Sequence, residues 1–223
     1  MPASMPLPRH AIAIDGPAAS GKSSVAQRLA ARLGYLYVNT GNMYRAVALL
    51  AHRRGVDPAD GEAVGALLKE GALSFASAGG EGTIRIDGSD PGDALKSAEV
   101  NASVSAIASH AQIRQTLVAR QRDYLKEADV VMEGRDIGSV VFAQTPYKFF
   151  IDAAPEVRAA RRAGEGLHDN LAARDATDSQ RKASPMVVPE GAVTIDSSHL
   201  SIDAVVEAVL SALKERGITP AGR

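Results

Sequence analysis

Short apolar runs alternate with helical patterns over the first quarter of the chain. Residues 11–15 form an apolar run that predicts a buried strand, and residues 22–33 repeat apolar positions on one helical face. A second strand is predicted at 35–38, and a second helix runs from about Asn42 to Gly55, just before the helix-breaking Pro58. This order of strand, helix, strand, helix favours an α/β protein with a parallel sheet.

The pattern changes between residues 60 and 101. A short helical pattern at 62–70 is followed by two strand-like runs at 72–76 and 83–87, which three glycines separate. This region interrupts the alternation of strands and helices. We therefore predict an inserted lobe.

Beyond the insert, the alternation resumes. Helical patterns are predicted at 103–126, with a possible break near Ser109 and His110, and at 155–163 and 204–213; strands are predicted at 129–132, 147–151 and 193–195. Pro155 suits the first turn of its helix. Residues 164–178 are charged and show no apolar period, so they are predicted to form a connection without a helix.

Composition excludes several classes of protein. The chain has 223 residues, of which 45% are hydrophobic and 23% charged, and its net charge of −1 offers no general attraction to nucleic acid or to an acidic membrane. The absence of cysteine excludes disulfides and Cys-ligated metals. Residues 1–10 lack a secretory apolar run, and no apolar stretch approaches the roughly 20 residues that cross a bilayer. We expect a cytoplasmic monomer.

One motif carries specific chemistry. Residues 16–23 fit the pattern G-x-x-x-x-G-K-[ST] between a predicted strand and a predicted helix, as a phosphate-binding loop (P-loop) requires. Its backbone N–H groups and the helix N-terminus face phosphate oxygens, Lys22 reaches the β and γ phosphates, and the Ser23 hydroxyl is placed to ligate Mg²⁺. The predicted ATP-binding residues are Gly16, Pro17, Ala18, Ala19, Ser20, Gly21, Lys22, Ser23 and Ser24.

A P-loop alone does not define the reaction. The chain has no N-K-x-D motif for guanine and no L-S-G-G-Q motif of transporter ATPases, which favours a small-molecule phosphotransferase. Arg45, Arg135 and Arg181 each stand at the edge of a predicted element beside a polar or glycine-bearing turn, where a guanidinium can hold a phosphate bidentately. A single such arginine is more often a solvated surface residue; beside a P-loop, three of them favour an acceptor phosphate site.

The sequence resembles the bacterial cytidylate kinases, which are P-loop nucleoside monophosphate kinases. The resemblance covers most of the chain and is carried by residues 14–24, 39–45, 133–138, 140–142, 174–181 and 195–198. The insert also resembles the enlarged acceptor lobe of this family. The implied fold is a parallel five-stranded sheet flanked by helices, with an inserted acceptor-binding lobe and a short lid.

The resemblance also implies roles for single residues. Arg45, Arg135 and Arg181 would hold the acceptor phosphate, Arg174 and Asp178 the sugar hydroxyls, and Ser105, Arg114 and Asp136 the cytosine; Thr40 joins this CMP-binding set, and Arg158, Arg161 and Arg162 would be the catalytic lid arginines beside Lys22. The spacing of the lid arginines puts them on one helical face. A solvated helix face would show the same spacing.

The chain departs from the family pattern at a few positions. Asn39 stands where an acidic residue is usual, and Glu133 replaces an aspartate but could still order Mg²⁺ through water. Ala19 replaces a glycine, which is tolerated if its φ is negative. The stretch between Arg162 and Arg174 is short and predicts a compact lid.

The resemblance divides the chain into a core, a lobe and a lid. The core comprises 10–40, 103–157 and 183–220, the acceptor lobe with a small inserted sheet comprises 41–102, the lid comprises 158–182, and flexible termini comprise 1–9 and 217–223. The implied reaction is phosphorylation of CMP and dCMP by ATP with Mg²⁺. The alternatives are a kinase for UMP or AMP and an ATP-binding regulator that transfers no phosphate.

Overall fold

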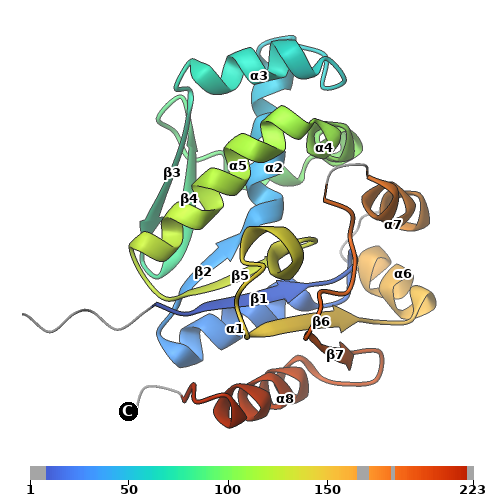
Figure 1. The fold of residues 1–223 in the computed structure, drawn as a ribbon. Coiled ribbons are helices and arrows are strands. Elements are labelled where there is room, and N and C mark those ends of the chain that lie inside the picture. The colour runs from blue at the N-terminus through green and yellow to red at the C-terminus, as the bar shows by residue number, and fades with distance from the viewer. Residues whose placement is uncertain (1–8, 165–170, 182–183, 220–223) are drawn as a thin grey trace, which may run out of the picture.

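Seven strands form one sheet at the centre of the protein (Figure 1). The computed structural model describes residues 9–164, 171–181 and 184–219, without the side chains of Ala172 and Arg174. The strands are β1 (Ala11–Asp15), β2 (Leu36–Asn39), β3 (Leu73–Ala78), β4 (Glu81–Ile86), β5 (Val130–Gly134), β6 (Lys148–Asp152) and β7 (Val193–Asp196). Their order in the sheet is β3-β4-β2-β5-β1-β6-β7.

The five strands β2-β5-β1-β6-β7 pair in parallel, which confirms the predicted parallel core. The two strands of the insert pair antiparallel with each other. β4 also pairs with β2 where Tyr37 lies opposite Glu81. The hairpin of the insert therefore extends the main sheet and does not form a separate small sheet.

Helices cover both faces of the sheet (Figure 1). They are α1 (Lys22–Leu33), α2 (Thr40–Arg53), α3 (Gly61–Lys69), α4 (Ala98–Ser109), α5 (Ala111–Asp123), α6 (Pro155–Gly164), α7 (Leu171–Gln180) and α8 (Ile202–Glu215), with short helical turns η1 (Gly92–Lys96), η2 (Tyr124–Lys126) and η3 (Ile137–Val141). Alternate residues of the strands face opposite sides, as strand geometry requires: Ala11 and Ala13 join the cluster under α2, α4 and α5, whereas Ile12 and Ile14 join the cluster under α1 and α8. Ile218 is also buried in the second cluster, beyond the start of the predicted C-terminal tail.

The long helical pattern after the insert is two helices. The break predicted near Ser109 and His110 is confirmed, because α4 ends at Ser109 and α5 begins at Ala111. α4 begins five residues before the predicted start. Ser97 caps it there by accepting a hydrogen bond from the Val100 N–H, which is a strong local signal for a helix N-terminus.

The prediction of a connection without a helix at 164–178 is wrong, because α7 begins within it. α7 has no apolar stripe to signal a helix; among its described side chains the buried one is Asp178, which is ion-paired with Arg135 and Arg181. Partners from another part of the chain thus stabilise a helix whose own sequence is polar. The predicted lid lies partly outside the described residues, which omit 165–170 and 182–183.

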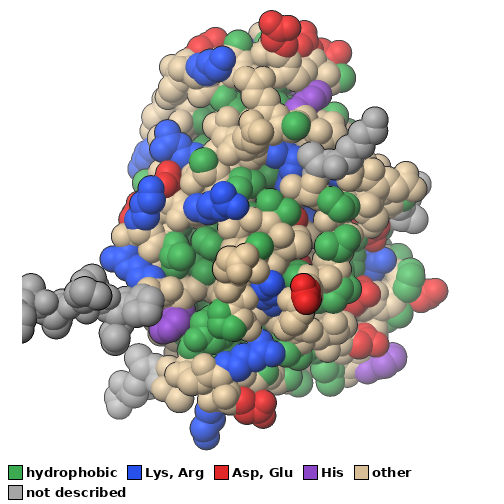
Figure 2. All heavy atoms as spheres, in the orientation of Figure 1, with side chains coloured by type: hydrophobic (Ala, Val, Ile, Leu, Met, Phe, Trp, Pro, Cys, Tyr) green, Lys and Arg blue, Asp and Glu red, His purple; other side chains and the backbone are tan. Residues whose placement is uncertain are grey.

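The carboxyl ends of β1, β2 and β5 meet at one edge of the sheet, where α1 and α2 begin (Figure 1). In open α/β sheets, this edge is where ligands bind. On the face shown in Figure 2, basic and acidic side chains of the described residues are both present, and neither kind covers it. None of the helices among the described residues has the length and apolar character of a membrane span.

Candidate active site

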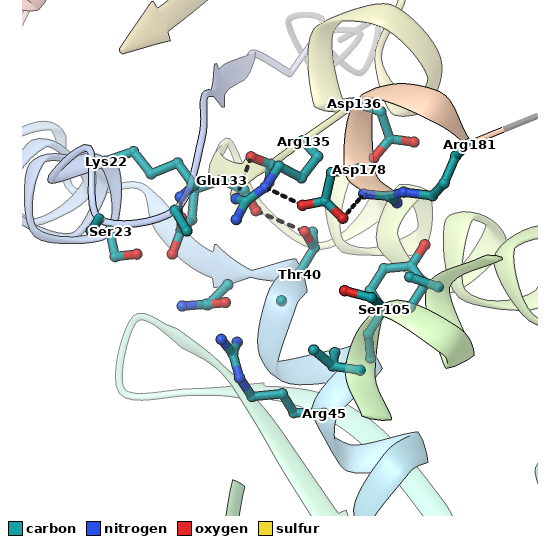
Figure 3. Close-up of a pocket in the computed structure, with 18 of the residues that line it drawn as sticks. Lys22, Ser23, Thr40, Arg45, Ser105, Glu133, Arg135, Asp136, Asp178 and Arg181 are labelled. Carbon is teal, nitrogen blue, oxygen red and sulfur yellow. Dashed lines mark hydrogen bonds and ion pairs between the residues drawn. The ribbon is translucent and has the colours of Figure 1, made fainter. Parts of the chain in front are cut away.

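A cavity of about 250 Å³ opens at this edge, between the P-loop, α2, α4, α5 and α7 (Figure 3). The sequence-predicted residues that line it are Ala18, Ala19, Gly21, Lys22, Ser23, Ser24, Thr40, Arg45, Ser105, Arg114, Arg135, Asp136, Arg162, Asp178 and Arg181. Residues predicted to bind the phosphoryl donor ATP and residues predicted to bind the acceptor CMP therefore line one cavity. Gly16, Pro17, Ser20, Arg158 and Arg161 are not part of its lining.

Glycines shape the two ends of the P-loop. Gly16 has φ of 150°, and a Cβ there would lie 2.0 Å from the Ile151 carbonyl oxygen, so no larger residue fits. Gly21 has φ of 86° immediately before α1. Both positions need the conformational freedom of glycine to turn the loop towards its ligand.

Ala19 departs from the expected backbone conformation. Its φ is 59°, in the left-handed region, whereas the sequence argument required a negative φ. A left-handed conformation costs a non-glycine residue about 1 kcal/mol or more, because its Cβ approaches the following carbonyl oxygen. The loop therefore keeps the shape set by its ends although alanine occupies this position.

Lys22 and Ser23 stand at the N-terminus of α1 (Figure 3). The Lys22 ammonium donates a hydrogen bond to the Pro17 carbonyl oxygen at 3.0 Å and lies 4.0 Å from a carboxylate oxygen of Glu133. Ser23 is exposed and lines the cavity. The loop thus curls around the lysine, and a cation and a hydroxyl both face the space where phosphates would lie.

Glu133 ends β5 beside the lysine and is almost fully buried. Its Oε1 accepts a hydrogen bond of 3.1 Å from the Tyr37 hydroxyl, which in turn accepts one from the Asn39 amide. Burial raises the pKa of Tyr37 well above its usual value, so this hydroxyl keeps its proton. Tyr37, supported by Asn39, thus helps to hold the carboxylate in place.

The side-chain oxygens of Ser23 and Glu133 suit Mg²⁺. Within the described ranges, no three His, Cys, Asp or Glu side chains cluster as a metal site. Mg²⁺ is commonly held by one or two protein oxygens together with phosphates and water. The Ser23 hydroxyl and the Glu133 carboxylate supply hard oxygen donors of that kind.

Arg114 and Asp136 form a buried ion pair at the acceptor end of the cavity. The guanidinium also lies over the ring of Tyr44, 5.5 Å from its centroid. Burial raises the pKa of Tyr44 to about 12, so the ring carries no charge near neutral pH. A carboxylate, a guanidinium and an aromatic ring together suit a flat polar base, and Ser105 lies beside them (Figure 3).

Asp178 links two of the predicted phosphate arginines (Figure 3). Its carboxylate accepts from Arg135 Nε at 2.9 Å and pairs with Arg181 at 2.5 Å. The Nε atoms of Arg114 and Arg181 are buried and have no hydrogen-bond partner among the described residues. Both arginines line the cavity, and a polar group of a bound ligand could satisfy such an N–H group.

The remaining acceptor residues come from α2. The Arg45 side chain is held by the side-chain oxygens of Asn101 and Asn42, and Thr40 donates to the Glu133 carbonyl oxygen at 2.8 Å. The side chain of Arg174 lies outside the described part of the chain. Its predicted role at the sugar remains a prediction.

The three lid arginines on α6 make different contacts. Arg162 lines the cavity. Arg158 donates to the Ala18 carbonyl oxygen in the P-loop and pairs with Asp175, whereas Arg161 donates to the Ser197 carbonyl oxygen at 2.7 Å. The Ser197 hydroxyl in turn donates to the carbonyl of Ser20. Two of the three arginines thus connect α6 to the loop, and the third faces the ligand space.

Sequence reasoning assigned no role to several residues of this region. Tyr44 lies within the 39–45 motif and Asp175 within the 174–181 motif, so position in a motif was their available signal. Ser197 lies in the 195–198 motif. Asp15, directly before the P-loop, is fully buried, and burial raises its pKa to about 7. A buried charge at the end of a strand is visible only in the folded structure.

The geometry points to two phosphate-bearing ligands in one cavity. A P-loop with its lysine forms one wall, and arginines from α2, α5, α7 and the end of β5 converge from the other. This arrangement defines the class of P-loop kinases, in which two anionic substrates are brought together.

Sequence comparison narrows this class to one family. The chain belongs to the cytidylate kinase family, whose sequence profile matches residues 12–215. It is 40% identical over 216 residues to the cytidylate kinase of Geobacillus sp. (strain WCH70), covering 92% of this chain and 96% of that protein. It is 41% identical over 221 residues to the cytidylate kinase of Solibacter usitatus (strain Ellin6076), covering 93% and 94%.

A solved structure supports the fold. The unliganded crystal structure of a sugar kinase from Janibacter sp. HTCC2649 matches with a TM-score of 0.50 at 12% identity, covering 96% of this chain and 97% of that one. At this identity the likeness concerns the fold alone.

Proposed function

We propose that this protein transfers the γ-phosphoryl group of ATP to CMP and dCMP, giving CDP and dCDP for pyrimidine nucleotide metabolism. Family membership supports the reaction, because the related proteins are named cytidylate kinases. The observation that carries the proposal is that the P-loop and the Arg114–Asp136 pair line the same cavity. We also propose that it acts as a cytoplasmic monomer.

The donor end would bind the ATP phosphates through charge and backbone N–H groups. The P-loop and the N-terminus of α1 surround the β and γ phosphates, and Lys22 stays close to the transferring group. Ser23 and Glu133 are the protein groups that would hold Mg²⁺, and the ion would supply positive charge against the negative charge that develops during transfer. Lys22 and the arginines supply the remaining positive charge.

The acceptor end would align CMP with the donor. Arg45, Arg135 and Arg181 hold its phosphate, whose attacking oxygen is already ionised near neutral pH, so no general base is needed. Catalysis is then alignment and charge neutralisation, both of which depend on groups fixed before the reaction. Arg162 adds a donor from α6 and helps to exclude water that would otherwise hydrolyse ATP.

Base recognition would rest on Asp136. Its carboxylate accepts a hydrogen bond from the exocyclic amine of cytosine, whereas it would face the carbonyl of uracil as acceptor against acceptor. Arg114 is held by the same carboxylate and would donate to a ring nitrogen or to the ring carbonyl oxygen of the base. UMP should therefore be a poor acceptor.

A coupled ADP-release assay tests the proposal against its alternatives. The purified protein is given MgATP with CMP, dCMP, UMP, AMP or GMP. We expect kcat/KM to be highest for CMP and dCMP. A preference for UMP or AMP would show that the acceptor is that nucleotide and not CMP. If none of the five nucleotides supports ADP release, the result would favour an ATP-binding regulator. Size-exclusion chromatography with light scattering measures the molar mass in solution and so tests the proposed monomeric state.

Removal of the P-loop lysine tests the donor site. We expect Lys22→Ala to lower kcat by at least roughly a hundredfold, which corresponds to about 3 kcal/mol, as for loss of one donor to a developing anion. Its contacts include the Pro17 carbonyl and the buried Glu133, so circular dichroism must accompany the assay and should show that the variant remains folded. Lys126→Ala removes an exposed lysine paired with Asp123 and should leave kcat unchanged. Substantial activity in folded Lys22→Ala would refute the donor site.

A further inference from the structure

The turn after β5 is held at both ends by side chains from other elements. This turn, η3, is a single π-helical turn that directly follows Arg135 and Asp136. At its start, Asp15 Oδ1 accepts from the Ile137 N–H at 2.7 Å and Oδ2 accepts from the Gly138 N–H at 2.8 Å. At its end, Arg122 of α5 donates to the carbonyl oxygens of Val140 and Val141 at 2.8 and 2.9 Å. The free backbone groups of a helical turn are thus paired by a carboxylate and a guanidinium.

Asp15 occupies an unusual position for a carboxylate. It is fully buried, ends β1 and directly precedes Gly16 of the P-loop. Burial raises its pKa to about 7; the two N–H donors and Arg135 oppose this shift, and Asp136 adds to it. A carboxylate buried at this cost must have both of its oxygens well bonded to remain compatible with folding.

The acceptor residues lie between two fixed backbone points. In the sheet, Gly134 pairs with Asp15 in parallel register. Three residues later, the Ile137 N–H is bonded to the side chain of the same Asp15. Arg135 and Asp136 form the short segment between these points, so Asp15 holds the backbone on both sides of them. Within the turn, the Asp136 carbonyl oxygen also accepts from the Val140 and Val141 N–H groups.

We infer that Asp15 is a positioning residue that couples the P-loop to the acceptor site by fixing the backbone of Arg135 and Asp136. This inference rests on the proposed function, since it concerns the CMP-binding role of those two residues. Phosphoryl transfer tolerates little misplacement, and an error of about 1 Å can cost roughly a hundredfold in rate. One carboxylate that belongs to the donor strand and holds the acceptor turn would keep the two substrates in register.

Asp15→Asn tests the inference with little change of shape. The asparagine keeps one acceptor oxygen, but its amide N–H₂ faces a backbone N–H that also donates. We expect KM for CMP to rise about tenfold and the CMP-to-UMP preference to narrow, with KM for ATP changed by less than about threefold. A purely electrostatic role predicts the opposite sign, because loss of a negative charge would lower KM for both anionic substrates.

Arg122→Gln is the matched control. It loosens the same turn at its C-terminal end and leaves the Asp15 contacts with Ile137 and Gly138 in place, and we expect a loss of thermal stability with KM for CMP unchanged. If Asp15→Asn behaves like this control, with lower stability and unchanged KM for CMP, Asp15 has only a structural role and the inference is wrong. Wild-type activity towards CMP is measured in the same series, so failure of the proposed function is seen separately.

Two further measurements apply if Asp15→Asn does not fold. Asp15→Ser retains a small hydroxyl acceptor and should show the same selective rise in KM for CMP. In the wild-type protein, hydrogen exchange should find the Ile137 and Gly138 amides protected, and CMP should protect them further because it binds the segment they hold. Rapid exchange of both amides with CMP bound would overturn the inference.

Discussion

Carboxylates pair with three arginines in the acceptor half of the cavity. Asp136 holds Arg114, and Asp178 holds Arg135 and Arg181, all with little exposure to solvent. Such pairs keep several positive charges together at the place where a phosphate would bind. Removing one partner of a buried pair leaves a charge without compensation, which commonly costs 3–5 kcal/mol. Variants of these residues therefore need a measurement of folding beside the assay.

At this scale, Asp136→Asn should weaken discrimination between cytosine and uracil. The amide of asparagine can turn its N–H₂ group towards the uracil carbonyl, which the carboxylate cannot do. One good base contact discriminates by roughly 1–3 kcal/mol. We therefore expect the ratio of kcat/KM for CMP to that for UMP to fall about tenfold, measured with the ADP-release assay.

Asp175→Asn is the control for this substitution. It also removes a carboxylate from a pair with an arginine, but Arg158 and the P-loop are its neighbours. Its CMP-to-UMP ratio should equal that of the wild type, whatever its rate. An unchanged ratio in folded Asp136→Asn would remove Asp136 from base recognition and leave Ser105 and Arg114 in that role.

At the scale of elements, α6 acts as a support for the P-loop as well as a source of ligand contacts. None of its residues is fully buried, and its arginines reach the loop, Ser197 and the cavity. A helix with so little apolar contact owes its place to these polar contacts and to any ligand they bind. Substitutions of its three arginines should therefore have different kinetic effects, although the spacing of these arginines places them on one face of the helix.

Alanine substitutions along α6 separate these effects. Arg162→Ala should lower kcat by roughly ten- to a hundredfold with little change in KM for CMP, because Arg162 lines the cavity and the proposed function places its guanidinium beside the transferring group. Arg161→Ala should raise KM for ATP, because Arg161 supports the loop through Ser197. Steady-state kinetics with each substrate varied in turn make the measurement.

The exposed Glu156 supplies the comparison within the same helix. Glu156→Ala changes a charge in the first turn and should leave both kcat and KM near the wild-type values. A rise in KM for CMP alone in Arg162→Ala would assign Arg162 to a static acceptor site and would contradict a role in the transfer step.

At the scale of the whole molecule, the cavity joins segments from almost the entire chain. Its lining extends from Ala18 in the P-loop to Arg181 at the end of α7. A ligand there contacts elements that are distant in sequence, so it stabilises only the folded arrangement. Binding then raises the free energy of unfolding by an amount that grows with the logarithm of ligand concentration divided by Kd.

Thermal unfolding should report both ends of the cavity. CMP at about 100 times its Kd should stabilise the protein by about 2.7 kcal/mol, which corresponds to a rise in Tm of roughly 5–10 °C for a chain of this size. UMP at the same concentration should have a much smaller effect. In Lys22→Ala the shift with CMP should persist and the shift with a non-hydrolysable ATP analogue should shrink. Equal shifts with CMP and UMP would contradict selective binding at Asp136.

The sequence by itself determined the parallel core and most of the cavity lining. Buried parallel strands need continuous apolar runs, and the helices that cover them need an apolar face, so β1, β2, α1 and α8 were visible as local patterns. The P-loop was visible because its chemistry requires glycine and lysine at fixed spacing. Placement beside polar or glycine-bearing turns singled out Arg45, Arg135 and Arg181 as candidates for binding phosphate. The roles of Arg114 and Arg174 came from the family resemblance, since no local pattern marks a residue that binds a base or a sugar.

Only the tertiary structure decided features that depend on partners distant in sequence. α7 was missed because ion pairs with Arg135 at the end of β5 support it in place of an apolar stripe. The left-handed Ala19 and the extension of the sheet by the β3–β4 hairpin were likewise invisible, as local preference favours neither. The contact of Asp15 with Ile137 joins residues more than a hundred positions apart. Such contacts arise because the sheet brings β1 beside β5. Burial of the Asp15 carboxylate is compatible with folding only when this pairing brings the Ile137 and Gly138 N–H groups within hydrogen-bond distance.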